Sequence, residues 1–472
     1  MHTTGRVLPL PRARNAAFAA LLIGMFMAAL DTNVVVAALP SLAVDLGIEA
    51  AGGVTAAYLL AVAVTTPLHG NLGDRWGRRR MFAASVVVFA AGSLACAVAP
   101  TMTVLIGARA VQGVGGGGLI VAAVSAMAEL FGRAEMLRRQ GWLTAMFAMS
   151  SIGGAPLGGL LTAAAGWRAI FLLNLPCCVV ALALGLGSVP GRKAARLPFD
   201  VAGAVLIAIA GSAIVVLGSN GALASSPLWT LLLVAVAAGA ALAFVRVERR
   251  APAPLVPPRL FVDAGLARAV VVTLLSGVAL FGGFTYVSLA ITGGSGGNPA
   301  ATGLLLLPMS IGQVFSGSGF AALARRWPRI AAWGRAGLAL GVAGSLGMAA
   351  IPLLSPSPVR IALTATALAL NGAALGLSMQ AYTVFAQSRA PKDILGAGMA
   401  TLTFARQIGG SVGIAAFGWT TVLFDGSGGL SMVFLLAAVA LLAGVVIAPR
   451  AKHDPPPSLP TGTVAGSGNT SA

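Results

Sequence analysis

Two charged residues lie inside otherwise apolar stretches of the sequence, and they are the residues best placed to do chemistry. Asp31 interrupts the apolar stretch 16–39, and Arg109 interrupts the stretch 102–128. A charged side chain in a membrane-spanning helix costs about 2.5–3.5 kcal/mol on insertion scales, so it normally marks a functional site. Burial favours the protonated form of a carboxylate and a neighbouring guanidinium favours the ionised form, so a change of surroundings can drive proton uptake and release. We therefore expect Asp31 and Arg109, with Gln112, to couple to protons.

The composition requires a membrane around most of this chain. It has 472 residues, of which 58% are hydrophobic and 9% are charged. An ordinary soluble domain carries about 25% charged residues, so a soluble protein of this length could not cover its surface. Fourteen membrane-spanning helices of about 20 residues each would fill about 60% of the chain, close to the apolar fraction. The sequence therefore predicts an all-α polytopic membrane protein.

Apolar stretches separated by polar or Gly/Pro-rich segments predict fourteen transmembrane helices. They lie near 16–39, 50–69, 81–99, 102–128, 136–164, 167–189, 199–218, 228–246, 266–292, 300–323, 331–352, 359–385, 398–423 and 429–449. With the N-terminus in the cytoplasm, the inside segments hold 26 of the 30 Lys and Arg residues, whereas the outside segments hold only Arg168 and Arg360. A missed helix would invert every later loop, so the positive-inside rule supports fourteen helices and predicts that both termini are cytoplasmic.

An internal repeat divides the predicted helices into two halves. Residues 72–78 resemble 323–329, and residues 152–155 resemble 408–411, at offsets of 251 and 256 residues. Offsets that agree predict two parallel six-helix bundles, a construction common in transporters, with two inserted helices between them. The predicted organisation is a cytoplasmic tail at 1–15, the N-terminal bundle at 16–190, two inserted helices at 191–247, a cytoplasmic linker at 248–265, the C-terminal bundle at 266–449 and a disordered cytoplasmic tail at 450–472.

The remaining composition argues against several other functions. The net charge of +18 follows from the basic cytoplasmic loops, so no nucleic-acid partner is expected. Cys96, Cys177 and Cys178 lie in apolar stretches, which indicates small core residues, and the three histidines lack metal-site spacing. The glycines of 113–118 lack the Lys-Ser/Thr of a phosphate-binding loop, and no cluster of nucleophile and base indicates an enzyme. We expect no metal or cofactor, and the low Lys and high Ala and Gly content indicates a bacterial inner membrane.

The depth of the two charges predicts that they interact. Asp31 lies about nine residues, or about 13 Å, from the outer end of its helix, and Arg109 lies about eight residues, or about 12 Å, from the same side. We expect contact directly, through Gln112 or through water. The alternative is a static ion pair that only holds the first and fourth helices together. Arg406, the other charge inside a helix, either faces a central cavity or extends its side chain to the cytoplasmic surface as an anchor.

Ordered motifs extend over most of the chain and point to a known family. The segment 70–80, GNLGDRWGRRR, places one acid among four arginines between the second and third predicted helices. The other motifs are LDTNVVVAALP at 30–40, RAVQGVGG at 109–116, GGAPLGG at 153–159, WRAIFLLNLP at 167–176 and RQIGGSVG at 406–413. This set resembles the fourteen-helix drug:proton antiporter family of the major facilitator superfamily. The resemblance implies export of hydrophobic, often cationic, compounds in exchange for protons by a monomer.

The resemblance also implies roles for two sets of residues. One set would latch the cytoplasmic side, with Asp74 docking at the start of the thirteenth helix, and it comprises Gly70, Asp74, Arg75, Gly77 and Arg78. The second set is the antiporter motif of the fifth helix, which packs helices closely, and it comprises Gly154, Ala155, Pro156, Gly158 and Gly159. Ala155 stands where antiporters usually have Gly, and Asn33 stands where the first-helix motif usually has Thr.

The lining of the expected cavity is the least determined feature. Met side chains adapt to varied ligands, and aromatic faces attract organic cations. The candidates are Met25, Phe147, Phe281, Phe284, Tyr286, Gln380 and Arg406. Each of them alternatively makes ordinary helix or lipid contacts. Asp31 is the one acid expected deep in a helix, which favours neutral or monocationic cargo. Other functions also remain open: uptake, export of one metabolite such as a self-made antibiotic, and a membrane sensor or scaffold without transport.

Overall fold

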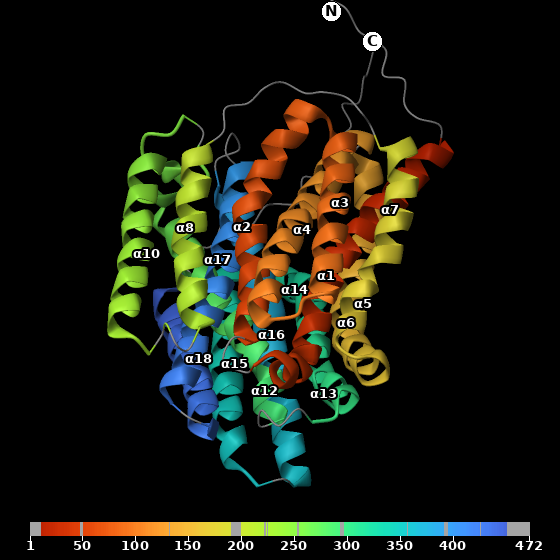
Figure 1. Cartoon of the computed structure of the whole chain (residues 1–472). Coiled ribbons are helices and arrows are strands. Elements are labelled where there is room, and N and C mark those ends of the chain that lie inside the picture. Colours follow the sequence, from red (N-terminus) through yellow and green to blue (C-terminus); the bar gives the residue numbers. More distant parts are fainter. Residues whose placement is uncertain are drawn as a thin grey trace, which may run out of the picture.

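The chain is helical throughout the part that the structure describes. The computed structural model describes residues 11–47, 51–131, 133–189, 200–220, 223, 225–252, 254–292, 297–355, 357–390, 395–424 and 426–450 (Figure 1). Every regular element in these ranges is a helix, and no strand occurs in them. Residues 1–10 and 451–472, on which most of the two expected tails fall, lie outside the described residues.

Seven helices cover the first predicted bundle. They are α1 (Pro11–Leu46), α2 (Ala51–Trp76), α3 (Arg78–Ala97), α4 (Met102–Leu130), α5 (Arg133–Ala165), α6 (Arg168–Leu172) and α7 (Asn174–Ser188). α1 continues through Pro40 because the residues around it are fully buried by packing, so it ends later than expected. The segment expected to connect the second and third helices is itself mostly helical. Only Gly77 separates α2 from α3, with a φ of 92° that Gly adopts without strain.

The remaining helices begin with two that follow the first bundle in sequence, α8 (Val201–Gly218) and α10 (Pro227–Glu248). They are followed by η1 (Pro258–Phe261), α11 (Ala264–Ser276), η2 (Gly277–Phe281), α12 (Gly282–Thr292), α13 (Pro299–Leu305), α14 (Leu307–Arg326), α15 (Ile330–Ala350), η3 (Ile351–Leu353), α16 (Pro358–Arg389), α17 (Leu395–Leu423) and α18 (Gly426–Ile447). The π-helical turn η2 links α11 and α12 into one long rod. Sequence periodicity gave no sign of this turn.

Thirteen segments of the described chain are long and apolar enough to cross a membrane. They correspond to thirteen of the fourteen expected helices, and α17 is the one left out. Polar residues such as Arg406 and Gln407 lower the mean hydropathy of α17, although its 29 residues are long enough to span a bilayer. Large apolar side chains also cover the outer surface, as at Leu231, which is 69% exposed, and Val446, which is 74% exposed. This surface suits lipid rather than water.

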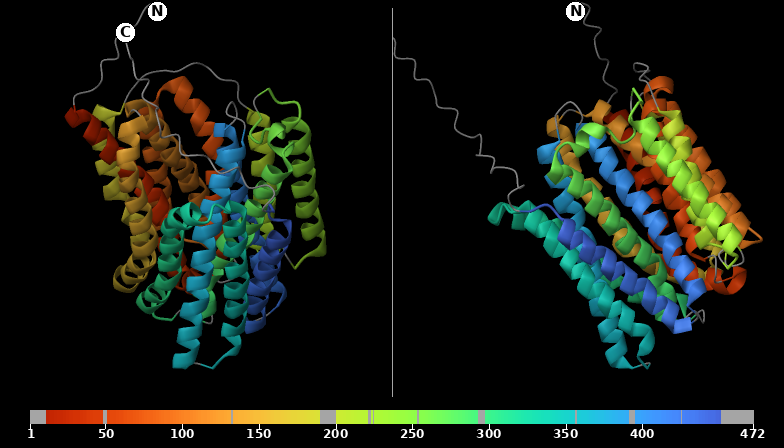
Figure 2. Two further views of the ribbon diagram at one scale, coloured as in Figure 1. Left: turned by 180° about the vertical axis from the view of Figure 1, so that it is seen from behind. Right: turned by 90° about the vertical axis from the view of Figure 1, so that its left-hand side faces the viewer.

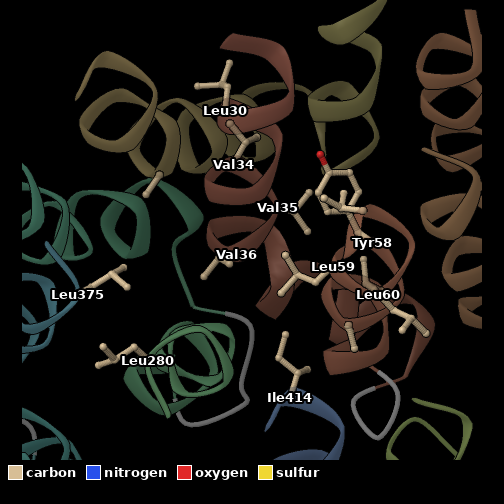
Figure 3. Packing of buried hydrophobic residues seen from close by; sticks show 14 of the residues in the cluster. Leu30, Val34, Val35, Val36, Tyr58, Leu59, Leu60, Leu280, Leu375 and Ile414 are labelled. Atoms are coloured by element: carbon tan, nitrogen blue, oxygen red, sulfur yellow. The ribbon is translucent and has the colours of Figure 1, made fainter. Parts of the chain in front are cut away.

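The helices pack through a buried apolar cluster that reaches both parts of the chain. Side chains from α1 and α2 approach those of η2, α16 and α17 in this cluster, as Leu59, Leu280 and Ile414 illustrate (Figure 3). α8 and α10 pack against each other at the side of the molecule, where α8 also contacts α2 and α17 (Figure 2). Glycines of α4 allow close approach, because a Cβ on Gly113 would meet the Tyr58 carbonyl oxygen at 2.6 Å.

The helical assembly has a distal and a proximal end, which differ in the helix connections that they carry. The distal end carries the connections α1–α2, α3–α4 and α5–α6, and the proximal end carries α2–α3 and α4–α5. The contacts between the first five helices and the helices from α11 onward include α5 with α13, α1 with α12 and α17 with α2. The connection between α12 and α13 lies at the distal end. In α2, the residue that bonds to α17 is Ala56, which lies near the distal start of α2. These contacts between the two parts of the chain therefore lie toward the distal end.

Candidate functional site

Asp31 and Arg109 form a buried ion pair between α1 and α4. Arg109 Nη1 donates to Asp31 Oδ2 over 2.5 Å. The exposed fraction is 4% for Asp31 and 0% for Arg109, so neither charge reaches water. The two residues therefore lie at the same depth, as their spacing from the helix ends predicts.

The second oxygen of Asp31 is held by two amide side chains. Gln112 Nε2 donates to Asp31 Oδ1 at 2.8 Å, and Asn174 Nδ2 donates to the same oxygen at 3.1 Å. Both amides also reach Ser93 Oγ on α3, at 2.8 Å and 3.2 Å. The carboxylate of Asp31 thus joins α1 to α4 and α7, and the amides extend the network to α3.

Arg109 has several other partners, although its buried Nη2 has no hydrogen-bond partner among the described residues. Its Nε donates to the Val54 carbonyl oxygen at 3.2 Å, and its Nη1 donates to Gln112 Oε1 at 2.6 Å. The Tyr58 ring lies 4.2 Å from the guanidinium carbon, a distance typical of a cation–π contact. Tyr58 in turn donates from its hydroxyl to the Ala28 carbonyl oxygen of α1 at 3.2 Å. The charge of Arg109 is therefore balanced within the protein.

Two members of this network were not identified as site residues from the sequence. Asn174 appeared only as one letter of the WRAIFLLNLP motif, and Ser93 lies in a helix without any motif. An Asn inside an apolar stretch was the available signal for the first. Nothing distinguished Ser93 from other small polar residues in helices, because its role depends on the rotation of α3 about its axis.

The expected latch segment lies at the proximal end. Arg78 Nε donates to Glu129 Oε1 at 2.9 Å, which ties the start of α3 to the end of α4. Gly73 lies beside the Arg78 guanidinium, and Arg75 is exposed. The side chain of Asp74 and the surroundings of Gly70 lie outside the described residues, as do the side chains of the first two residues of α17, Leu395 and Gly396. The docking of Asp74 onto α17 stays a prediction.

The small residues of the expected antiporter motif face two different helices. On one side of α5, Gly158 lies against the backbone of Val34 in α1, and Gly154 lies against the side chain of Asn33. On the other side of α5, Ala155 and Gly159 face α13. Pro156 lies within the same helix. The motif therefore forms a close contact between α1, α5 and α13.

The expected cavity residues do not gather at one place. Met25 is buried in α1, Phe147 is 47% exposed on α5, and Gln380 is exposed on α16. Tyr286 is 3% exposed and donates from its hydroxyl to the Ile414 carbonyl oxygen at 2.8 Å, so it joins α12 to α17. The other three candidates, Phe281, Phe284 and Arg406, are partly exposed.

Comparison with known proteins identifies the family. The family model described as the Major Facilitator Superfamily matches residues 21–414, which is most of the chain. The chain belongs to this superfamily. Among its relatives in the superfamily is an uncharacterized MFS-type transporter of Mycobacterium tuberculosis, which is 35% identical over 421 residues. That match covers 88% of this chain but only 60% of the relative, so the chain spans less than two thirds of that protein's length.

Two further relatives of this MFS chain carry functional names. The multidrug transporter protein MdtP of Bacillus subtilis is 29% identical, over 86% of this chain and 75% of the relative. The methylenomycin A resistance protein of Streptomyces coelicolor is 32% identical, over 90% of both chains. Among solved structures, the crystal structure of an auto inhibited POT family peptide transporter matches 93% of this chain and 96% of its own, with a TM-score of 0.66 and 16% identity. That likeness supports the fold alone.

Proposed function

We propose that this chain is a secondary active transporter that exports hydrophobic, drug-like compounds in exchange for protons by alternating access. The observation that carries the proposal is the buried carboxylate of Asp31, to which Arg109, Gln112 and Asn174 each donate a hydrogen bond. The groups that face this carboxylate are all donors, so none of them could accept a hydrogen bond from a proton added to Asp31. Proton binding therefore requires α1 to move relative to α4 and α7.

The proposed architecture has fourteen membrane-spanning helices, with α17 as the fourteenth. Two six-helix bundles move relative to each other, and α8 and α10 are an insertion at their side. The contacts of α8 with α2 and α17 support this placement, because those helices belong to different halves. The basic residues of the proximal connections support cytoplasmic termini in a bacterial inner membrane, where the protein acts as a monomer. The distal end is then extracellular.

In this orientation the described conformation is closed to the outside. The contact of α5 with α13 lies at the distal end, and Ser411 Oγ donates to the Ala56 carbonyl oxygen across α17 and α2 at 3.0 Å. In the second conformation this end would be open, so that a proton entering from outside reaches Asp31, cargo leaves to the outside, and the carrier is reset. The latch residues around Asp74 would close the cytoplasmic end in that second conformation.

The experiment is transport by the purified protein in proteoliposomes under an imposed pH gradient. Dyes of different charge are supplied, and dye movement and proton movement are recorded together. Asp31→Asn is compared with Asp45→Asn, a matched control in the same helix whose carboxylate accepts from Trp167 Nε1 at 2.8 Å near the distal end. We expect the gradient to drive dye in the opposite direction to protons, and Asp31→Asn alone to abolish this exchange. If Asp31→Asn retains coupled exchange, the pair is a static link between α1 and α4.

A second candidate is the export of one metabolite, such as an antibiotic made by the same cell. The name of the Streptomyces coelicolor relative, which refers to resistance to a single antibiotic, favours this candidate. The name of the Bacillus subtilis relative favours broad export. The same assay separates the two, because a dedicated exporter moves one compound and leaves the rest of the panel in place.

A further inference from the structure

Arg406 lies deep in α17 rather than near its end. It follows the first residue of the helix, Leu395, by eleven positions, which corresponds to about 17 Å along the axis. An arginine side chain is shorter than this distance, so Arg406 cannot reach the cytoplasmic end of its helix. This depth favours the interpretation in which Arg406 faces a central cavity over the interpretation in which it anchors the helix at the cytoplasmic surface.

The face of α17 that carries Arg406 points between two other helices. One turn away on the same face, a Cβ on Gly410 would lie 3.0 Å from Phe281 Cβ of η2 and 3.1 Å from Leu59 Cδ1 of α2. Figure 3 shows Ile414, a further turn along, beside Leu59. Burial decreases toward the proximal end, because Gly410 is buried, Arg406 is partly exposed and Thr403 is exposed. Arg406 thus lies where the junction between the two halves begins to open toward the cytoplasm.

The charge of Arg406 is not balanced within the described part of the protein. Its guanidinium makes no ion pair, hydrogen bond or cation–π contact with a described residue. Arg109, at a similar distance from the other end of the assembly, is bonded to Asp31, Gln112 and Val54. An unpaired cation inside the membrane is costly and is normally kept for function. Among the described residues deep in the helices, the charge of Arg109 is therefore neutralised by Asp31, and the charge of Arg406 is not neutralised.

We infer that Arg406 binds an acidic group of the cargo, so that the transporter carries hydrophobic organic acids with one carboxylate on an apolar body. A guanidinium offers paired N–H donors that match the two oxygens of a carboxylate, and this geometry favours carboxylates over other cargo. Phe281, which is partly exposed next to the same face, supplies an apolar surface for the rest of the cargo molecule. The inference rests on the proposed export function and replaces the cationic cargo that the family resemblance implies.

An anionic cargo changes the electrical character of the exchange. When one monoanion leaves and one proton enters, both movements carry positive charge inward, so each cycle moves two charges. When one monocation leaves and one proton enters, no net charge moves. An inside-negative membrane potential therefore drives export of the acid even without a pH gradient, and it does not drive exchange of a monocation.

Binding to the purified full-length protein tests the inference without any gradient. The probes are pyrenebutyric acid, its neutral amide and pyrenebutylamine, which share one apolar body and differ in charge; binding is read from energy transfer between tryptophan and pyrene. Arg406→Gln is compared with Arg325→Gln, which removes the same charge at the exposed end of α14. Arg325 bonds there to the Ala321 carbonyl oxygen of its own helix and to no other described residue. We expect wild type and Arg325→Gln to prefer the carboxylate by about tenfold or more, and Arg406→Gln to lose that preference.

The outcomes separate the inference from the proposed function. A wild-type protein that binds the amine or the amide as well as the carboxylate, or binds none of the three, overturns the inference. So does an Arg406→Gln protein that elutes and melts like wild type and keeps its preference for the carboxylate. Arg406→Lys keeps the charge without the paired donors, so it should retain part of the preference. If carboxylate binding depends on Arg406 but transport does not need protons, the inference about the cargo is supported and the proposed proton antiport is wrong.

Discussion

Gly159 of α5 and Gly303 of α13 lie in direct backbone contact across the two halves of the chain. A Cβ on Gly159 would lie 3.1 Å from the Cα of Gly303, and a Cβ on Gly303 would lie 3.2 Å from the Cα of Gly159. The carbonyl oxygens of Pro299 and Ala155 approach these positions still more closely. Two helices can come this near only where neither carries a side chain, so a side chain at either glycine would disrupt the contact between α5 and α13.

Gly303→Val should open the distal end of the molecule. A valine side chain at Gly303 collides with the backbone of α5, so the closed conformation loses stability relative to the open one. Spin labels on Ala165→Cys and Ser355→Cys, both exposed at the distal end, report the separation of the halves. We expect a longer mean distance in Gly303→Val. Gly319→Val is the control, because Gly319 of α14 has no atom within 4 Å of its Cβ position, and an unchanged distance in Gly303→Val would mean that the contact does not hold the distal end closed.

The sequence predicted the central pair of this site for a physical reason. Asp31 and Arg109 are conspicuous because charges are rare inside apolar helices, and their depths follow from counting residues at 1.5 Å per residue. The partners of the pair depend on how each helix is rotated about its axis, which residue spacing in one sequence does not determine. Ser93 and Asn174 therefore emerged only from the structure.

The ends of the helices were likewise predicted where local sequence determines them and missed where packing between helices does. Apolar length predicted the spanning helices, thirteen of which the described chain contains by length and composition. The segment 70–76 reads as a loop because of its glycines and charges, yet it continues α2, since only Gly77 needs a positive φ. The π-helical turn at Gly277–Phe281 leaves no mark in the periodicity, because its extra backbone spacing arises from packing against α17.

Asn174→Leu should slow proton-coupled transport without unfolding the protein. The variant removes one of the three donors to the Asp31 carboxylate and leaves Gln112 as the amide that holds Asp31 Oδ1. A hydrogen bond to a charged group is worth about 1.5–3 kcal/mol, so we expect a transport rate at neutral pH that is about one tenth of the wild-type rate or less. Asn371→Leu removes a buried amide that bonds to Ala367 and Ser345, far from Asp31 in sequence, and should leave the rate near that of wild type. An equal loss of rate in both variants would exclude a specific role for Asn174.

Asp263 at the start of α11 should contribute pH-dependent stability. Its carboxylate pairs with Arg389 of α16 at 2.5 Å and accepts from the Leu266 amide at 2.8 Å, and the Arg389 hydrogen bonds hold the pKa of this carboxyl below its usual range. A lowered pKa in the folded state gives stability that is present at neutral pH and is lost as pH falls through that pKa. Since both side chains are partly exposed, the ion pair contributes roughly 0.2–1 kcal/mol.

Asp263→Asn isolates this ion pair, because Asn still caps the helix. We expect a lower melting temperature than wild type at pH 7 and a smaller difference near pH 3, because the carboxyl of wild type gains its proton as pH falls through its lowered pKa. Asp263→Ala removes the cap as well and should melt lower than Asp263→Asn at both pH values. A difference between wild type and Asp263→Asn that persists unchanged to pH 3 would assign the effect to packing instead.

Glu248 ties the segment after α10 back to the end of that helix. Its two carboxylate oxygens accept from the backbone amides of Leu255 at 3.1 Å and Val256 at 3.2 Å, and the residue is only 5% exposed. Glu248→Ala removes both acceptors and leaves two partly buried amides without these partners, so the segment should detach from α10. Trypsin, which cleaves after Arg250 in this segment, should then cut faster in inside-out vesicles. Glu129→Ala breaks the ion pair with Arg78 at the same end of the molecule and should leave cleavage after Arg250 unchanged. Cleavage that accelerates equally in right-side-out vesicles would place this segment outside the cell and reverse the proposed orientation of the whole chain.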